Sequence, residues 1–211
     1  MKRETYHHGD LRRALIEAAT ELLKSVDPTT LSLRQVSEKT GVSHAAAYRH
    51  FRDKAGLWAA VSELGFKRLT ERLRLARVFA GTSHRDQFAA MCDEYVRFAI
   101  DEGSVYRMMF GPHFQEQLAR AGFEEAARFA FYELHSTVIG AQGAGTMREG
   151  SSFLLSQTIW ALLHGLALFY LDGQLTADPS HLITGQCWNF LWEGIEKHGG
   201  GSSGELPRGA Q

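Results

Sequence analysis

The stretch Ser32–Lys54, SLRQVSEKTGVSHAAAYRHFRDK, has the pattern of two short helices joined by a tight turn. Ser32 followed three residues later by Gln35 has the spacing of a capping box, which marks a helix start. Gly41 follows a polar run, where a helix end needs a residue in the left-handed conformation that glycine adopts without steric cost. Ser43 is the expected cap of the second helix. Together these features predict a helix-turn-helix motif, whose second helix enters the major groove of DNA.

The second helix of this motif is expected to have a face that is free to meet DNA. Ala47 and Phe51 lie four residues apart and are expected to pack on the first helix. The residues expected to point outward are small, aromatic or hydrogen-bonding: His44, Ala45, Ala46, Tyr48 and Arg49. Small side chains let the backbone approach base edges, an alanine methyl touches a thymine methyl, and an arginine reaches guanine O6 and N7.

Polar residues around these positions complete the predicted DNA-binding set. Tyr48, His50 and Lys54 suit phosphate contacts, which position a protein without reading sequence. Asp53 is expected to cap the next helix, which places Lys54 in its first turn beside free N–H groups. The full set of predicted DNA-binding residues is Ser32, Arg34, Ser43, His44, Ala45, Ala46, Tyr48, Arg49, His50 and Lys54.

The same stretch, with the start of the next helix, closely resembles one protein family. GVSHAAAYRHFRDKAGL (residues 41–57) is similar to the turn, recognition helix and following helix start of TetR-like transcriptional regulators. Ala47 departs from the pattern, because the family more often has leucine there, and the smaller side chain weakens the packing of the recognition helix. The resemblance covers about residues 10–60, and the matching positions are Val42-Ser43, Tyr48, His50-Phe51 and Lys54.

The resemblance implies an all-α fold, with an N-terminal three-helix helix-turn-helix head and a C-terminal helical ligand-binding and dimerisation body. It also implies a transcriptional repressor that binds an inverted-repeat operator in double-stranded DNA as a homodimer and is released by a small-molecule effector. The expected organisation is a flexible arm over 1–9, a DNA-binding domain over 10–54, an effector-binding and dimerisation domain over 55–198, and a disordered tail over 199–211.

Apolar periodicity and cap residues predict the remaining helices. Gly140–Gly150 is rich in glycine and is predicted to be a loop. The first helix is expected to begin at its cap, Asp10, and the last at Asp178-Pro179, which has the cap-then-proline order of a helix start. The predicted helices, besides the two of the motif, are 10–26, 53–79, 84–102, the short segment 105–110, 114–121, 123–139, 151–171 and 178–198.

The last two predicted helices carry a second resemblance. Trp160 and His164 lie four residues apart and share a helix face, and Gly165 is expected to allow close backbone approach. IWALLHGLALFYLDG (residues 159–173) resembles the body domain of TetR-like proteins that is named for its Trp-His-Gly residues. In such proteins the last two helices pair with those of a second subunit as a four-helix bundle.

A small, largely apolar effector is predicted to bind between the middle helices of the body. Helical bundles hold ligands between facing helices, in mostly apolar cavities with a few polar groups. The helix over 53–79 is the expected lever between head and pocket, and the 105–110 segment is expected to shift against it. For a single histidine or aromatic residue, a place in the core is the favoured alternative. The candidate effector-binding residues are Phe88, Tyr95, Phe98, Tyr106, Met109, Phe110, His135 and Trp160.

Charge is distributed unevenly along the 211 residues, although the net charge is only -1. Ten basic and seven acidic residues through Lys54 leave a charge of +3, whereas thirteen basic and seventeen acidic residues in the remainder leave -4. A basic head on an acidic body is consistent with a DNA contact at one end of the molecule. Hydrophobic residues make up 44% of the chain, which is enough for a folded core.

Other features predict a cytoplasmic protein with no membrane partner. The two cysteines, Cys92 and Cys187, lie in apolar helical stretches and are expected to be buried free thiols. No apolar run follows the basic N-terminus, so no signal peptide is predicted. The apolar stretch near Ile159–Leu171 is interrupted by His164 and is expected to be too short to span a bilayer.

Competing functions rest on weaker patterns. Gly200–Gly204 matches the alternating glycine and serine pattern of a hydrolase elbow, but the strand that must precede such an elbow is missing. We therefore predict no catalytic residue, no cofactor and no metal site. The alternative functions are an activator or global DNA-binding protein without an effector, or a ligand carrier or enzyme whose head is only structural.

Overall fold

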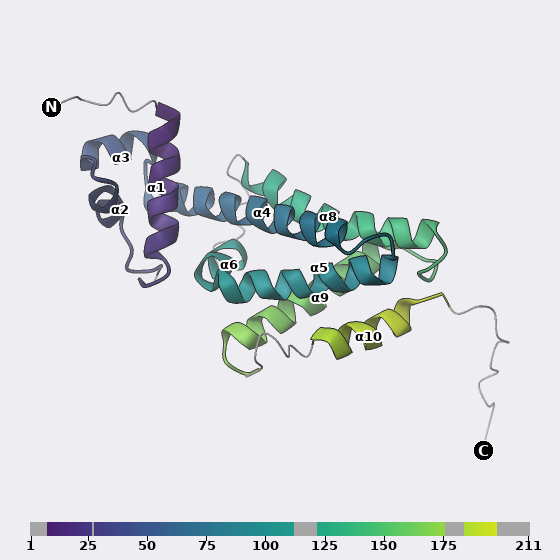
Figure 1. Cartoon of the computed structure of the whole chain (residues 1–211). Helices are drawn as coiled ribbons and strands as arrows, with labels where there is room; N and C mark the ends of the chain where they lie inside the picture. Colours follow the sequence, from purple (N-terminus) through teal and green to yellow (C-terminus); the bar gives the residue numbers. More distant parts are fainter. Residues whose placement is uncertain (1–7, 27, 112–121, 176–183, 198–211) are drawn as a thin grey trace, which may run out of the picture.

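The computed structural model describes residues 8–26, 28–111, 122–175 and 184–197, which form α-helices and no strand (Figure 1). The N-terminal head consists of α1 (His8–Leu22), α2 (Leu33–Thr40) and α3 (His44–His50). The body follows, and its helices are α4 (Lys54–Phe79), α5 (His84–Asp101), α6 (Gly103–Phe110), α8 (Phe123–Gly143), α9 (Ser152–Leu171) and α10 (Thr184–Ile195). The predicted all-α class, with a helix-turn-helix head and a helical body, is confirmed.

Side-chain caps set the limits of the two motif helices. The Ser32 hydroxyl accepts a hydrogen bond from the Gln35 N–H, and the Gln35 side chain accepts one from the Ser32 N–H at 2.8 Å. Gly41 ends α2 with φ of 71°, and the next N–H reaches back to the Ser37 carbonyl at 3.0 Å. Ser43 caps α3 by accepting from the Ala46 N–H at 3.2 Å. The predicted capping box, left-handed glycine and second cap are all confirmed.

The head has its own apolar core. Ala47 is 1% exposed and Phe51 is 4% exposed, so the recognition helix packs as predicted despite its small residue. The guanidinium of Arg12 lies 5.4 Å from the centre of the Phe51 ring and covers it from α1. The other buried apolar residues of this core are Leu15, Ile16, Ala19, Leu23, Leu31, Leu33 and Val36.

Two expectations for the first helix were wrong. It begins at His8, so Asp10 lies inside α1, and the expected arm loses its last two residues to the helix. Aspartate is favourable both as an N-cap and within the first turn, because both places lie near the positive end of the helix dipole. The presence of Asp10 alone therefore does not fix the residue at which the helix begins. The helix also ends at Leu22 and not near Val26, since i to i+3 hydrogen bonds tighten the chain there. Residues 1–7 lie outside the described part of the chain.

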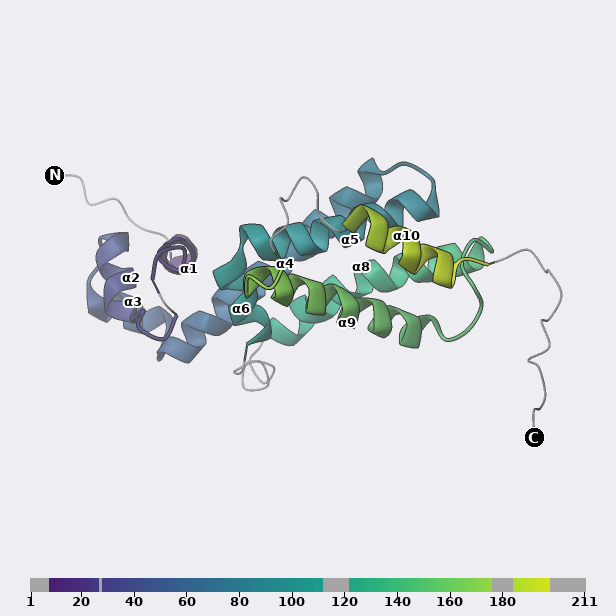
Figure 2. The same ribbon diagram turned by 90° about the horizontal axis from the view of Figure 1, so that it is seen from below.

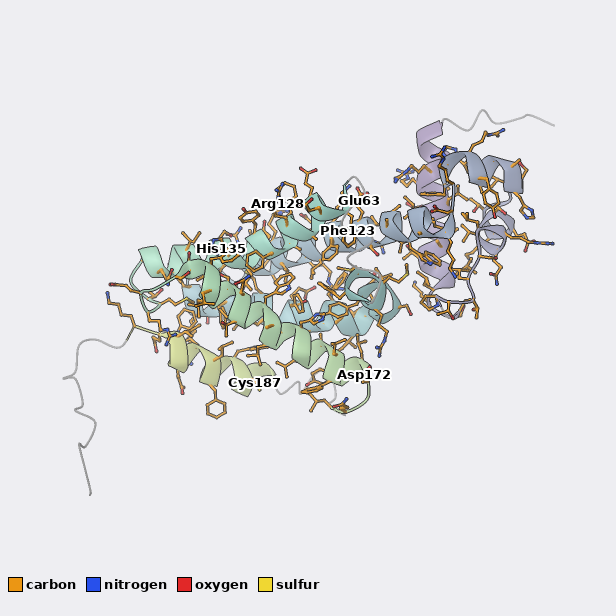
Figure 3. All side chains as sticks on the ribbon, turned by 180° about the vertical axis from the view of Figure 1, so that it is seen from behind. Glu63, Phe123, Arg128, His135, Asp172 and Cys187 are labelled. Carbon is orange, nitrogen blue, oxygen red and sulfur yellow. The ribbon has the colours of Figure 1, made fainter. Side chains whose placement is uncertain are left out.

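α4 joins the head to the body (Figure 1). Asp53 caps it by accepting from the Gly56 N–H at 2.6 Å, as predicted. Leu57, near its start, is fully buried in the core continuous with the head, and further along Phe66 packs edge-on against Phe123 at 5.4 Å. Figure 3 shows Glu63 and Phe123 at this crossing, where α8 begins beside α4. One continuous helix therefore runs from the head to the middle of the body.

α6 approaches α4 unusually closely at Gly65. A Cβ atom placed on Gly65 would lie 2.6 Å from the Met109 sulfur and 2.7 Å from a Val105 methyl carbon, distances that real Cβ atoms do not show. A side chain at position 65 would therefore force Met109 and Val105 to move, whereas glycine leaves the contact between the two helices undisturbed. The short segment predicted at 105–110 is thus the greater part of a helix that rests directly on the expected lever.

α9 and α10 form the side of the body that faces the viewer in Figure 2. α9 packs on α5 and α8, and α10 packs on α5. The indole N–H of Trp188 on α10 donates to the Asp93 carboxylate of α5 at 2.5 Å, and Arg85 donates to Asn189 at 2.9 Å. The loop after α8 is tied to the end of α10, because the Arg148 N–H donates to the Ile195 carbonyl at 2.7 Å.

The limits of the body helices correct some expectations. α8 continues through Gly143, so the loop expected from Gly140 begins later; Val138 and Ala141 are fully buried, and this packing outweighs the low helix propensity of glycine. α10 is described from Thr184, and α9 starts at Ser152 behind its cap Ser151. α10 ends at Ile195 and not at 198, because Glu196 forms a bridge with Met147 of the loop after α8. The start expected at 178–179, the helix expected at 114–121 and the tail at 199–211 lie outside the described residues.

Candidate DNA-binding and ligand-binding sites

The recognition helix presents a mixed polar and aromatic face to solvent. His44, Ala45, Tyr48 and Arg49 are exposed, and Tyr48 shows 53% of its surface. Ala46 is buried, so its expected outward position was wrong. Positions four apart share a helix face, so Ala46 lies on the same inward face as His50, and Ala47 on the same face as Phe51, which follows the helix. This placement also explains why His50 is half-buried.

The predicted residues outside the recognition helix have specific partners. The Ser32 and Ser43 hydroxyls serve as helix caps, and Ser43 remains exposed. The Lys54 ammonium donates to the Thr29 carbonyl at 2.7 Å and lies 5.4 Å from the centre of the Trp58 ring. To contact a phosphate, the Lys54 ammonium must either release the Thr29 carbonyl or use another of its three N–H groups for the phosphate oxygen.

A carboxylate that the sequence analysis did not select lies beside two of the predicted DNA-binding residues. Glu38 Oε1 accepts a hydrogen bond from Arg34 Nε at 2.9 Å and lies 3.8 Å from His44 Nε2. Glu38 thus joins α2 to the first residue of the recognition helix. Its four-residue spacing from Arg34 is typical of a helical ion pair and was the signal available in the sequence.

The body contains a buried chain of three hydrogen-bonding groups. The hydroxyls of Tyr95 on α5 and Tyr106 on α6 lie 3.0 Å apart, and the Tyr106 hydroxyl lies 2.6 Å from His164 Nδ1 on α9. Burial raises the pKa of both tyrosines above the ordinary phenol value and lowers the pKa of His164 below the ordinary imidazole value. The three groups are consequently neutral near pH 7, and Tyr106 and His164 Nδ1 share one hydrogen bond.

Aromatic rings surround this chain and extend it toward α8. Trp160 lies between Tyr95, at 5.0 Å between ring centres, and Phe131, at 5.7 Å. Phe110 packs on the His164 ring at 4.7 Å. His135, which Figure 3 labels on α8, shares a hydrogen bond of 3.1 Å with the Ser156 hydroxyl of α9.

Five of the eight predicted effector-binding residues belong to this aromatic cluster, and three do not. Phe88 packs on Trp192 at 5.6 Å, Phe98 lies under the Arg72 guanidinium at 5.5 Å, and Met109 is buried against Gly65. These three residues therefore lie outside the aromatic cluster. The five that come together are Tyr95, Tyr106, Phe110, His135 and Trp160, and the structure adds Phe131 and His164.

A surface groove of about 370 Å³ lies elsewhere, between α9, α10 and the loop that follows α8. Apolar residues from both helices form its walls, among them Leu154, Ile159, Phe190 and Leu191. Leu154 is 63% exposed and Phe190 is 73% exposed, so this groove is part of a larger apolar surface. None of the predicted effector-binding residues lines it.

α9 is very apolar and yet largely uncovered within one chain. The helix is long and apolar enough to cross a membrane by length and composition, with a mean hydropathy of 1.5, but only 22% of this window is buried. The helix is longer than the apolar stretch expected from the sequence, because it starts at Ser152 and not at Ile159. A Cβ atom on Gly165 would meet no atom within 4 Å, so the close backbone approach expected there does not occur among the described residues.

The described residues contain no group of three or more histidine, cysteine, aspartate or glutamate side chains arranged to hold a metal ion. Cys92 is a buried free thiol as predicted, whereas Cys187 is only partly buried. Burial raises the pKa of the Cys92 thiol well above its usual range, which leaves it protonated and unreactive. The glycine and serine pattern at 200–204 lies outside the described part of the chain.

Comparisons with known proteins agree on the family of both halves of the chain. Residues 15–61 match the family described as bacterial regulatory proteins, tetR family, and residues 88–187 match the tetracyclin repressor-like C-terminal domain. No curated protein sequence matches the chain significantly.

Solved structures show the same fold over nearly the whole chain. A protein of unknown function from Rhodococcus sp. RHA1 is 32% identical, with a TM-score of 0.79 over 92% of this chain and 99% of its own. A bacterial regulatory protein in the tetR family from Rhodococcus RHA1 is 16% identical, with a TM-score of 0.69 over 89% and 98%. A TetR-family transcriptional regulator from Pectobacterium atrosepticum is 18% identical, with a TM-score of 0.68 over 90% and 94%.

Proposed function

Because this chain belongs to the TetR family of bacterial regulatory proteins, we propose that it is a cytoplasmic, non-catalytic repressor that binds an inverted-repeat operator as a homodimer. A small, largely apolar effector then releases it from DNA. The observation that carries the DNA-binding part is the exposed face of α3, where His44, Tyr48 and Arg49 project from a well-capped and well-packed helix. Such a face supplies both phosphate contacts and one residue able to read guanine.

Substitutions on this face separate base reading from phosphate contact. Arg49→Ala is expected to weaken operator binding by about 1–3 kcal/mol and to relax the preference at one base pair, because a bidentate arginine–guanine contact is lost. Lys54→Ala is expected to weaken all sequences alike and to reduce the slope of log affinity against log salt by about one. Fluorescence anisotropy with operator variants at several salt concentrations measures both effects. Equal losses on all sequences for Arg49→Ala would exclude a base-reading role for that residue.

The exposed apolar surface of α9 and α10 supports the homodimer. Leu162 and Phe169 on α9 remain 41% and 47% exposed, and the same helix shares an apolar groove with α10. Stable homodimers commonly bury about 2,000 Å² or more of such surface. A Cβ atom on Gly165 would meet no atom of the described residues within 4 Å, which leaves room for a partner helix to come close. We interpret this surface as a helix–helix interface between two subunits, which also accounts for the high hydropathy of α9.

The aromatic cluster around Trp160 supports an effector site between α5, α6, α8 and α9. Its polar groups, Tyr95, Tyr106 and His164, are neutral near pH 7, so the site favours an uncharged, largely apolar molecule with a hydrogen-bonding group. The cluster is closely packed, and binding requires its rings to move apart. A ligand acts as an inducer only if it binds this rearranged form better than the DNA-binding form.

The contact between α6 and α4 offers a path from this site to the head. Tyr106 and Phe110 belong to the cluster, and Met109 on the same short helix touches Gly65 of α4. Movement of α6 would therefore shift α4, which packs against α1 of the head. A coupling of about 1–3 kcal/mol along this path changes operator affinity roughly 5–150-fold.

A further inference from the structure

The head carries an ion pair directly beside its DNA-binding face. Arg34 Nε donates to Glu38 Oε1 at 2.9 Å, and the two side chains are 74% and 55% exposed. His44 Nε2 lies 3.8 Å from the same oxygen and is itself 47% exposed. One carboxylate oxygen is therefore shared between a residue of α2 and the first residue of the recognition helix.

The geometry of this contact fixes the orientation of Arg34. Glu38 engages the guanidinium through Nε, which lies on the edge nearest the side-chain stem. Arginine has five N–H donors in a rigid plane, so the four on its two terminal nitrogens stay available when Nε is engaged. With Nε held, the guanidinium plane has lost rotational freedom before it meets a phosphate, and less entropy is lost on binding.

The same carboxylate is unfavourable to DNA in any other arrangement. A negative charge near the binding face repels phosphates, and this repulsion is offset only where Arg34 and His44 lie between the carboxylate and the backbone. Specific proteins commonly combine attraction to the right partner with repulsion of the wrong one.

We propose that Glu38 is a positioning residue that sets the discrimination of this protein between operator and non-operator DNA, by holding Arg34 for one phosphate. The proposal rests on the proposed DNA-binding function. Glu38 is then an acidic residue with a role in a face whose other polar residues attract DNA.

The test compares two substitutions of Glu38 with a matched control. Glu38→Gln keeps an oxygen that accepts from Arg34 Nε but removes the charge, whereas Glu38→Ala removes both. Arg13 and Glu17 of α1 form a control pair with the same i, i+4 spacing, at 3.6 Å and with 74% and 58% exposure. Glu17→Ala and Glu17→Gln therefore change the net charge of the head identically without touching Arg34.

The probes are a duplex selected by the wild-type protein from random DNA and a scrambled duplex of the same composition. Both Glu38 variants are expected to bind the scrambled duplex about threefold more tightly than wild type, since one nearby negative charge is removed. Glu38→Gln is expected to gain little on the selected duplex, where Arg34 and His44 already offset the charge, and therefore to lower the ratio of selected to scrambled affinity only about threefold. Glu38→Ala is expected to lower that ratio about tenfold, because an oriented, charge-assisted contact is lost.

Any of three results would overturn the proposal. The first is an equal ratio of selected to scrambled affinity for Glu38→Ala and Glu38→Gln, and the second is an equally large change of that ratio in the Glu17 variants. The third is that Glu38→Ala lowers the ratio just as much in a protein that already carries Arg34→Ala. Thermal unfolding midpoints within about 2 °C of wild type are expected for all variants, because these ion pairs are exposed. If the wild-type protein selects no duplex at all, the proposed function itself fails, which is a different outcome from an unchanged ratio.

Discussion

Leu162→Asp is expected to convert the dimer to a monomer and to weaken operator binding by at least about a hundredfold. Leu162 is 41% exposed on α9, within the apolar surface shared with α10. An unpaired carboxylate buried between apolar helices carries a desolvation penalty of several kcal/mol, which exceeds what the neighbouring contacts supply. A monomer then loses the second half-site, and linked binding modules gain about 10²–10⁴ over either alone.

Sedimentation velocity and anisotropy on the same samples measure the two effects. Phe129→Asp is the matched control, because Phe129 is also a large apolar residue, 51% exposed, but lies on α8. This control is expected to remain dimeric with wild-type DNA affinity. If Leu162→Asp, Phe169→Asp and Phe190→Asp all remained dimers, the subunit interface would lie on another surface.

Trp160→Ala is expected to abolish most of the response to an effector while leaving operator binding in place. The indole lies between Tyr95 and Phe131 and within 6.4 Å of Phe110, so its removal deletes the central contact of the cluster. Effector affinity should fall at least about tenfold. This change corresponds to about 1.4 kcal/mol of binding free energy, which the loss of a few apolar contacts accounts for. The unfolding free energy should fall by about 3 kcal/mol, the low end for large aromatic residues, because Trp160 is only partly buried.

The measurement starts from a compound that raises the unfolding temperature of the wild-type protein in a screen of uncharged apolar molecules. Calorimetric titration then gives its affinity, and anisotropy gives its power to release operator DNA. Phe129→Ala removes an exposed aromatic residue outside the cluster and should change neither value. An unchanged affinity in Trp160→Ala would place the effector outside this cluster.

Local chemistry was predictable from the sequence. Ser32, Ser43 and Asp53 cap their helices, and Gly41 takes the left-handed conformation, because each of these features depends only on residues within one turn. The family resemblance rests on the same short stretch. The fold class and the order of the helices followed from these caps and from apolar periodicity.

Features that depend on tertiary packing were less predictable. Ala46 was expected outside because, in a helix of seven residues, the boundary between the buried and exposed faces depends on how the helix is tilted on its neighbours. Phe88, Phe98 and Met109 share an apolar character with the cluster residues, but packing turns them toward Trp192, Arg72 and Gly65. Nothing local marked Gly65 itself as the place where α6 meets α4, since a glycine inside a helix pattern has several explanations.

The ion pair of Glu38 shows a third kind of limit. The four-residue spacing of Glu38 from Arg34 indicates an ion pair, but an acidic residue is not expected in a DNA-binding face, which is recognised by its basic and aromatic residues. The contact with His44 joins two helices across the turn and depends on their relative orientation. Only the folded head shows that one carboxylate lies beside both residues.

The central claim is that this chain reads DNA as a symmetric dimer through α3. Selection of bound duplexes from random DNA by the full-length wild-type protein, followed by sequencing, tests it most directly. The account predicts an enriched motif with two-fold symmetry, whose half-sites lose one base preference when Arg49→Ala is selected in parallel. Recovery of no enriched motif, or of a motif without two-fold symmetry, would contradict it.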